Sequence, residues 1–183
     1  VVDDGSTDET PSLLKSYGNR IVVVSKQNGG VATSRNTAMR AASGDLFALL
    51  DGDDLCMPER VAVQVAALTA DSDIALCSTE FSAFNADGPV APRYSPTYYS
   101  ALGRIEGGFR HLLPETRMVM ADGGTFRVQV GHAFPEILFG NFLHPPTVMF
   151  PRSTWAAVGD FDESLRNQCD WHWIARAAKA GRV

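Results

Sequence analysis

The sequence predicts an α/β fold in which a mostly parallel β-sheet is flanked by helices. In the first half of the chain, short apolar runs alternate with helical segments, which is the pattern of successive βαβ units. The chain has 183 residues, of which 45% are hydrophobic and 20% charged. This size and composition suit one globular domain with a sizeable core.

Turn and cap signals place the elements of this first half. A helix is expected to begin at Thr10, whose hydroxyl would cap it, because Pro11 suits a first turn. Further helices are expected over residues 31–42 and after Pro58, the latter with an apolar stripe at Val61, Val65 and Leu68. Strands are expected at the apolar runs, which occupy residues 1–2, 21–24, 46–50 and 74–77. The β-branched run at residues 21–24 is expected to be buried on both faces.

The pattern loosens after about Asp87. Prolines and glycines are scattered from Gly88 to Gly140 with poor periodicity, so this segment is either a variable substrate-facing region or a set of loops over the sheet. Order returns with an expected strand over residues 147–150 and helices over residues 153–158 and 170–180. Because the chain opens within a strand and stops just after a helix, we expect a fragment that is incomplete at both termini.

Composition excludes some classes of function. The formal net charge of −5 argues against a protein that binds nucleic acid by neutralising phosphates. No apolar stretch is long enough to span a bilayer, and no basic-then-apolar leader opens the chain. Cys56, Cys77 and Cys169 show no metal-type spacing, so we expect buried free thiols in a reducing compartment. The expected location is cytoplasmic or peripheral at the inner face of the membrane.

Two acidic clusters follow expected strands. Asp3 and Asp4 close the first strand, and Asp51, Asp53 and Asp54 close the third. Ligands of open α/β sheets bind beyond the carboxyl ends of the strands, and carboxylates suit Mg²⁺ or Mn²⁺ shared with phosphate. Alternatively, such aspartates only cap helices and turns. Two clusters at one edge of one sheet favour a binding site.

Several motifs, taken in order, resemble the family 2 glycosyltransferases, which have the Rossmann-like GT-A fold. These motifs are VDDGSTD at residues 2–8, NGG at 28–30 with RN at 35–36, LDGDD at 50–54, and GDFDESL at 159–165 leading to DW at 170–171. The resemblance covers residues 1–54 and about 141–180. It implies a single catalytic domain over residues 1–183, with a nucleotide-binding half (1–87) and an acceptor-side half (88–183).

The resemblance also implies ligands and roles. The donor would be a nucleotide-diphosphate sugar, with UDP-sugar favoured, and the acceptor an unknown glycan or lipid-linked molecule. Asp4, with Asp3 beside it, would contact the nucleotide base. The glycines Gly29 and Gly30 would let the backbone approach the nucleotide, since they carry no Cβ. Arg35 would lie near the diphosphate, although a solvated arginine on a helix face is nearly as good an explanation.

The Asp-X-Asp motif of the family corresponds to Asp51 and Asp53. Asp53 would hold Mg²⁺ or Mn²⁺, and Asp51 would reach the ribose or a metal-bound water. Asp170 matches the catalytic base, which would take the proton of an acceptor hydroxyl as it attacks the anomeric carbon with inversion. The metal would neutralise the charge that develops on the leaving diphosphate.

Some positions depart from the family pattern or have a structural explanation. Cys169 and His172 stand where acidic residues are usual, and core packing explains them better than a soft-metal pair. His144 is better explained as a structural loop histidine than as a metal ligand. The tryptophans could stack on sugars but at helical spacing are more often core residues; they are Trp155, Trp171 and Trp173. Only Trp171, next to Asp170, is favoured for stacking.

Two alternative functions stay open. A Mg²⁺-dependent nucleotidyltransferase would share the βαβ sheet and the paired aspartates, but its Gly-rich basic phosphate loop is not visible here. A truncated or inactive nucleotide-binding module would keep the motifs without the chemistry.

Overall fold

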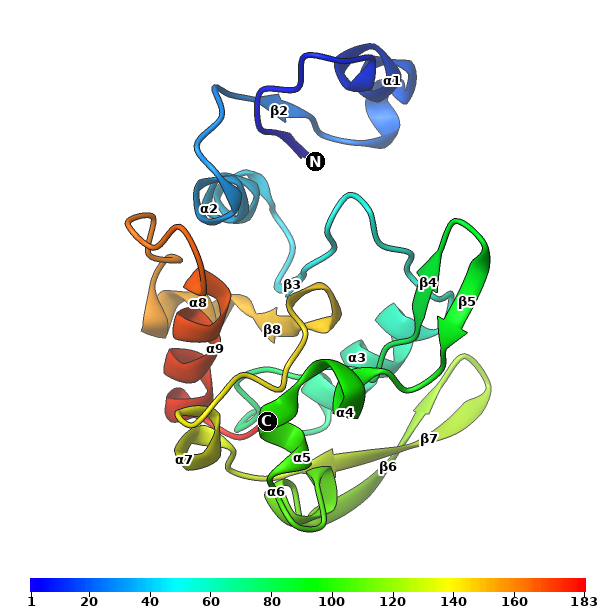
Figure 1. Cartoon of the computed structure of the whole chain (residues 1–183), viewed down its shortest axis with the longest axis vertical. Helices are drawn as coiled ribbons and strands as arrows, with labels where there is room; N and C mark the ends of the chain where they lie inside the picture. Colours follow the sequence, from blue (N-terminus) through cyan, green and yellow to red (C-terminus); the bar gives the residue numbers. More distant parts are fainter. The chain divides into compact units, whose positions relative to one another are not determined.

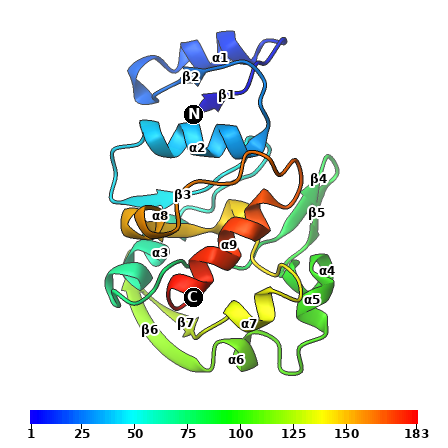
Figure 2. The same cartoon turned by 90° about the vertical axis from the view of Figure 1, so that its left-hand side faces the viewer.

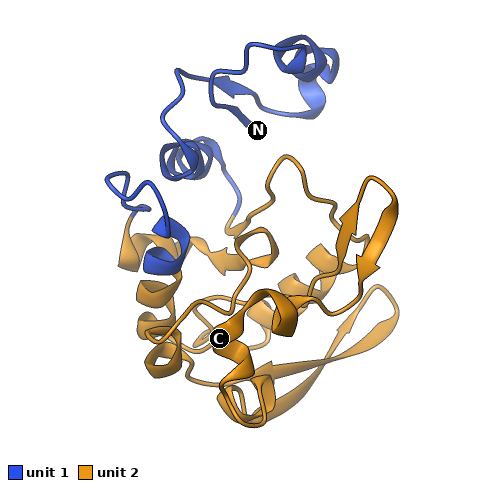
Figure 3. Ribbon diagram, viewed as in Figure 1, with its two compact units in different colours: residues 1–44, 160–173 blue, residues 45–159, 174–183 orange.

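The computed structural model describes residues 1–183 as a mixed α/β protein (Figure 1). The chain forms two compact units (Figure 3). Unit 1 consists of Val1–Gly44 and Asp160–Trp173, and unit 2 consists of Asp45–Gly159 and Ile174–Val183. The predicted α/β class is confirmed in this general form. The predicted functional division between residues 87 and 88 stays a prediction.

Unit 1 is built on one parallel pair of strands. Strand β1 (Val2–Asp3) pairs with β2 (Val24–Ser25), so that Val2 lies opposite Val24. Helices α1 (Thr10–Ser16) and α2 (Val31–Ala41), the 3₁₀ helix η1 (Gly18–Arg20) and the start of α9 (Cys169–Ala180) complete the unit. The helices expected after Thr10, from Val31 and from Asp170 are thus confirmed to within one or two residues.

Two expectations about unit 1 are wrong. Thr10 is the first helical residue and not the cap; its amide donates to Asp8 Oδ1 at 2.9 Å instead. The run at residues 21–24 is not buried on both faces, since Val22 is 70% exposed and Val23 38%. Strand β2 pairs with β1 alone, and a β-branched run is buried on both faces only where other elements cover both.

Unit 2 contains three antiparallel strand pairs. Strand β3 (Leu46–Ala48) pairs with β8 (Met149–Pro151), and two hairpins follow the chain between them (Figure 2). The hairpins are β4 (Ala83–Asn85) with β5 (Gly88–Ala91), and β6 (Glu115–Ala121) with β7 (Gly124–Val130). The expected strand at residues 74–77 forms only two isolated bridges, Ile74 with Arg182 and Cys77 with Met149. A mostly parallel sheet is therefore not confirmed by the observed pairings.

The helices of unit 2 include several very short ones. Helix α3 (Arg60–Thr69) and helix α8 (Arg152–Val158) agree with expectation. The shorter ones are α4 (Ser95–Tyr98), α5 (Ser100–Gly103), α6 (Phe109–Leu112), α7 (Phe134–Ile137) and the 3₁₀ helix η2 (Pro145–Thr147). The loosely patterned segment after Asp87 thus contains hairpins and short helices and is more than loops. No helix is long and apolar enough to cross a bilayer.

A core cluster of unit 2 joins α3 to the strands. It contains Leu68, Ile74, Val130 and Met149, all 5% exposed or less. Of the stripe expected on α3, Leu68 is buried and Val65 packs against the cluster, but Val61 is 48% exposed. The run at residues 46–50 alternates between buried and exposed side chains. Phe47 and Leu49 are buried, and Leu50 is 50% exposed.

Candidate functional site

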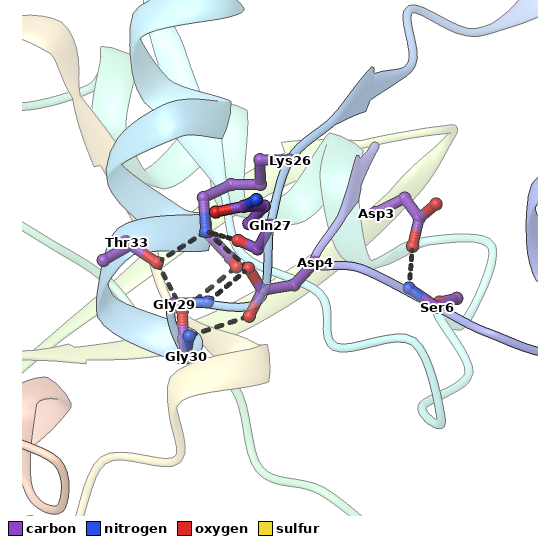
Figure 4. Close-up of polar contacts among 9 residues, drawn as sticks. Asp3, Asp4, Ser6, Lys26, Gln27, Gly29, Gly30 and Thr33 are labelled. Atoms are coloured by element: carbon purple, nitrogen blue, oxygen red, sulfur yellow. Dashed lines mark hydrogen bonds and ion pairs between the residues drawn. The ribbon is translucent and has the colours of Figure 1, made fainter.

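The carboxylate of Asp4 is the centre of a hydrogen-bonded cluster in unit 1 (Figure 4). Its Oδ1 accepts from Lys26 Nζ at 2.5 Å and from the Gly29 amide at 3.0 Å. Its Oδ2 accepts from the Gly30 amide at 2.8 Å. Lys26 Nζ also donates to Thr33 Oγ1 at 3.0 Å. The cluster connects the end of β1 to the first turn of α2, so Asp4, Gly29 and Gly30 are brought together as one site.

This environment keeps Asp4 ionised. Partial burial alone would raise the pKa of the carboxyl. The hydrogen bond from Lys26, those from the amides of Gly29 and Gly30 and the positive charge of Lys26 outweigh burial and lower the pKa. A carboxylate oxygen has about two acceptor positions. Oδ1 uses both on Lys26 and Gly29, whereas Oδ2 has one protein donor. The half-buried Asp4 carboxylate can therefore accept one further hydrogen bond from a ligand.

Glycine is needed at Gly5 for this geometry. Gly5 has φ +85°, and a Cβ there would lie 2.9 Å from the backbone nitrogen of Asn28. The turn after β1 thus approaches residues 26–30 more closely than a side chain permits. Asp3, by contrast, is 6% exposed and accepts the Ser6 amide at 2.9 Å. This contact fits the turn-capping alternative, and the expected nucleotide contacts of Asp3 and Asp4 stay predictions.

A second part of unit 1 is held together by Asn36, which is fully buried in α2. Its Nδ2 donates to Phe161 O at 2.9 Å and to Glu163 Oε1 at 2.8 Å, and its Oδ1 accepts the Phe161 amide at 2.8 Å. The guanidinium of Arg35 lies over the Phe161 ring, 5.6 Å from its centroid. Arg35 is therefore packed against Phe161 as well as half-buried, and its expected place near a diphosphate stays a prediction.

Asp170 is the second residue of α9 and is half-buried. The preceding Gln168 has φ +62°, the left-handed region that non-glycine residues seldom occupy. Cys169 beside it is buried, and burial raises the pKa of its thiol; the negative charge of Asp170 acts in the same direction and Arg35 in the opposite one. Cys169 is thus a core thiol, as expected, and it lies near both Asp170 and Arg35.

Unit 2 contains the other acidic cluster, in a turn after β3. The Asp54 amide donates to Asp51 O at 3.2 Å, which folds the loop back on itself. Asp53 is exposed, and Asp51 and Asp54 are half-buried. Burial raises the pKa of Asp54, and the charges of Asp53 and then Asp51 raise it further, against the opposing effects of His144 and Arg60. The negative charges of Asp53 and Asp51 thus disfavour the ionised form of Asp54.

The side chains of this turn would supply only part of the ligand set of a divalent cation. No group of three or more His, Cys, Asp or Glu side chains gathers around a metal position. Mg²⁺ is usually bound through one or two carboxylates, with water and substrate phosphate as the other ligands. Asp51 and Asp53 supply such a partial set. A cation bound to them would offset the negative charges that raise the pKa of Asp54.

Arg60 and Gln64 of α3 bond to the backbone just after β3 and in η2, and sequence reasoning missed both. Arg60 Nη2 donates to Leu49 O at 2.9 Å, and Arg60 Nε donates to Gln64 Oε1 at 2.9 Å. Gln64, only 2% exposed, donates through Nε2 to Thr147 O at 2.8 Å. Their i, i+4 spacing on one helix face was the available signal.

The structure also shows the surroundings of the histidine, tryptophan and cysteine side chains named in the sequence analysis. His144 packs in a loop, stacked on Phe81 with ring centroids 4.2 Å apart. Trp173 is fully buried and stacked on Phe161, as expected for a core residue. Trp155 packs edge-on against Phe47 with ring centroids 5.4 Å apart.

Cys77 is largely buried, with its thiol pKa raised to about 12 by burial. Cys56 is exposed, so the expectation of three buried thiols is wrong there.

The predicted site residues thus divide between the units. Unit 1 contains the expected nucleotide-binding residues of the first two motifs and the expected base, namely Asp3, Asp4, Gly29, Gly30, Arg35 and Asp170. Unit 2 contains the expected metal ligands Asp51 and Asp53. Within unit 1, direct hydrogen bonds join Asp4 to both glycines.

Comparison with known proteins agrees with the motifs of residues 2–54. Residues 1–132 match the model of the family described as glycosyl transferase family 2. A chondroitin synthase of Pasteurella multocida (strain Pm70) is 36% identical over 93 residues, which are 49% of this chain and 10% of that protein. A hyaluronan synthase of Pasteurella multocida is similar to the same extent.

A third relative covers nearly the whole chain. An uncharacterized glycosyltransferase of Rickettsia typhi (strain ATCC VR-144 / Wilmington) is 37% identical over 174 residues, 93% of this chain and 46% of that protein. The chain therefore spans less than half the length of these relatives. The family match covers well over half of the chain and includes the Asp4 cluster and the acidic turn. This chain belongs to glycosyl transferase family 2.

Proposed function

We propose that this protein transfers a sugar from a nucleotide-diphosphate donor, with UDP-sugar favoured, to a hydroxyl of a glycan or lipid-linked acceptor. The transfer inverts the anomeric configuration and is assisted by Mg²⁺ or Mn²⁺. The observation that carries the proposal is the turn after β3 that contains Asp51, Asp53 and Asp54, closed by the hydrogen bond from the Asp54 amide to Asp51 O, in a chain of this family. We further propose a role in polysaccharide synthesis, at a location that is cytoplasmic or peripheral at the inner membrane face.

The proposed donor contacts use the Asp4 cluster. A ring N–H of the base donates to the open acceptor position on Asp4 Oδ2, while Lys26 and the two glycine amides keep the carboxylate ionised and oriented. Asp3 keeps the turn after β1 in shape through its bond to Ser6. In this proposal residues 1–87 carry most donor contacts, including Arg35 toward the diphosphate, and residues 88–183 face the acceptor.

The proposed chemistry divides between Asp53, Asp51 and Asp170. Asp53, with Asp51, would hold the cation, which supplies charge neutralisation for the leaving diphosphate. Asp170 accepts the proton of the attacking hydroxyl. Asp170 is in the first turn of α9, where the positive end of the helix dipole lies. An ionised carboxylate is the form that can accept a proton.

The deciding experiment is hydrolysis of UDP-sugars by the full-length protein, with and without Mn²⁺. Release of free sugar and UDP that depends on Mn²⁺ is the expected result. Release of pyrophosphate would favour a nucleotidyltransferase instead. Nucleotide binding without either product would favour a module that binds but does not react, and the proposal would then be wrong.

A further inference from the structure

A buried glutamine of helix α3 bonds to the backbone at one end of the sheet of unit 2. Gln64 is only 2% exposed. Its Nε2 donates to Thr147 O at 2.8 Å and to Cys77 O at 3.4 Å, and its Oε1 accepts from Arg60 Nε at 2.9 Å. One side-chain amide thus connects two backbone segments that are distant in the sequence.

Arg60 extends this network to the segment that precedes the acidic turn. Its Nη2 donates to Leu49 O at 2.9 Å and to Val148 O at 3.5 Å. The Leu49 amide also donates to Val148 O, at 3.0 Å. Leu49 is therefore fixed at both of its backbone polar groups, at the amide by the residue before β8 and at the carbonyl by α3.

The carbonyl groups of this network lie at one edge of the sheet. Strand β3 pairs antiparallel with β8, and on the other side of β8 Cys77 exchanges two backbone hydrogen bonds of 2.8 Å with Met149, also antiparallel. The carboxyl end of β3, the carboxyl end of the segment that ends at Cys77 and the start of β8 therefore share this edge. Asp51 follows Leu49 by two residues, which span at most about 7 Å of chain.

Packing alone does not require a glutamine at this place. Helix α3 buries three residues, which are Gln64, Ala67 and Leu68. An apolar side chain of similar volume would fill the space of Gln64 but would remove its hydrogen bonds to Thr147 O and Cys77 O. Because a buried carbonyl without a donor costs free energy, the glutamine supports backbone that leaves regular strand pairing here.

We infer that Arg60 and Gln64 are positioning residues for the acidic turn. They fix the point at which the chain leaves the sheet at Leu49, and thereby the placement of Asp51 and Asp53. Two carboxylates suffice for a divalent cation only when they are correctly placed, since water and phosphate supply the other ligands. The inference rests on the proposed function, because it concerns the metal of the same reaction.

The test measures Mn²⁺ binding to the full-length protein in the presence of UDP, by EPR of the free ion. It also measures the Mn²⁺ concentration that gives half-maximal UDP-sugar hydrolysis. Gln64→Met keeps the side-chain volume without the amide, and Arg60→Met removes the guanidinium. We expect each to weaken Mn²⁺ binding, and to raise the half-maximal concentration, by about tenfold or more. Arg60 is half-buried, so its variant keeps the test available if Gln64→Met does not fold.

The matched control is Thr154→Val. Thr154 is 6% exposed and its hydroxyl donates to Ala75 O at 2.7 Å, so this variant also loses a buried hydrogen bond to the backbone, two residues before Cys77. If the network only stabilises the fold, all three variants should lower the melting temperature without changing Mn²⁺ affinity. We expect Thr154→Val to lower the melting temperature and to bind Mn²⁺ within about twofold of wild type.

Arg60→Lys separates positioning from an effect of charge. Lysine keeps the positive charge but lacks the forked guanidinium that bonds Leu49 and Gln64 together. We therefore expect Arg60→Lys to weaken Mn²⁺ binding as well. Wild-type Mn²⁺ affinity in this variant would mean that Arg60 acts through its charge, and the inference would be overturned for Arg60.

The inference as a whole is overturned if Gln64→Met and Arg60→Met bind Mn²⁺ as wild type does, or if Thr154→Val weakens binding equally. Mn²⁺-dependent hydrolysis in wild type together with either result would leave the proposed function standing. Wild-type protein that neither binds Mn²⁺ with UDP nor hydrolyses UDP-sugars would overturn the proposed function and this inference together.

Discussion

At the scale of single residues, the ionised state of Asp4 should be measurable as a pH-dependent contribution to stability. The pKa of Asp4 is below its ordinary value of 3.8. A carboxyl with a lowered pKa in the folded state stabilises the fold above the unfolded-state pKa, and this contribution is lost as the pH falls through the folded-state pKa. Asparagine can still accept an amide hydrogen bond but cannot form the ion pair with Lys26.

We therefore predict that Asp4→Asn lowers the free energy of unfolding by on the order of 1 kcal/mol at about pH 6. The difference from wild type should shrink toward zero as the pH falls below 3.8. Urea denaturation at a series of pH values measures it. Lys26→Met, which removes the other partner, should flatten the same pH dependence. A difference that is constant with pH would show that the ion pair does not contribute.

Asp170 can be tested as a base separately from any part it plays in stabilising the first turn of α9. Asparagine has nearly the same size and shape as aspartate but cannot accept a proton at neutral pH. In the full-length enzyme we predict that Asp170→Asn keeps the melting temperature and nucleotide binding of wild type. Its rate of sugar transfer should fall by about 10²- to 10⁴-fold.

The control for this substitution is Asp162→Asn, which changes a carboxylate of the same unit that accepts from the Ser164 amide in a turn. It should leave the transfer rate near that of wild type. Near wild-type transfer in Asp170→Asn would mean that the base lies elsewhere, and the segment from Asp87 to Gly140 would be searched next.

At the scale of elements, α2 is attached to residues 160–163 by one buried and one exposed interaction. Asn36 is fully buried and makes three hydrogen bonds to Phe161 and Glu163. Arg40 on the same helix pairs with Asp160, but their side chains are 54% and 35% exposed. Exposed ion pairs contribute little, whereas an unpaired buried polar group is costly.

We predict that Asn36→Ala lowers the free energy of unfolding by about 2–4 kcal/mol, because it leaves the backbone of Phe161 without its partners. Arg40→Ala should cost less than about 1 kcal/mol. Denaturant unfolding of both variants at neutral pH gives the comparison. If both substitutions lowered the free energy of unfolding equally, burial of Asn36 would not be the reason for its contribution.

At the scale of the whole molecule, a metal-dependent ligand should stabilise the native state. The gain in free energy of unfolding grows with the logarithm of the ligand concentration relative to its Kd. A ligand at 100 times its Kd adds about 2.7 kcal/mol when it binds only the native state. We predict that UDP raises the melting temperature in Mn²⁺ but not in chelator. Asp53→Ala should abolish this increase, since the diphosphate charge would lose its counter-ion, and Asp51→Ala should reduce it. An equal increase in chelator and in Mn²⁺ would rule out the proposed metal.

The sequence by itself determined the local features of this protein. Helices α2, α8 and α9 lie within one or two residues of their predicted bounds, because turn residues and helical periodicity are local signals. The family, too, was evident from short motifs, and the match over residues 1–132 confirms it. The roles proposed for Asp53 and Asp170 come from those motifs, and the structure adds only their surroundings.

Tertiary structure alone decided what depends on contacts between distant segments. Val22 and Val23 are exposed because β2 pairs with β1 alone, which their β-branched composition does not reveal. Asp4 is held by amides 25 and 26 residues away, and Asn36 bonds to Phe161 across 125 residues. The Phe81 ring stacks on His144, which is distant from it in the sequence. Periodicity reports on a segment of one element, whereas burial and hydrogen-bond partners are set by which segments the fold brings together.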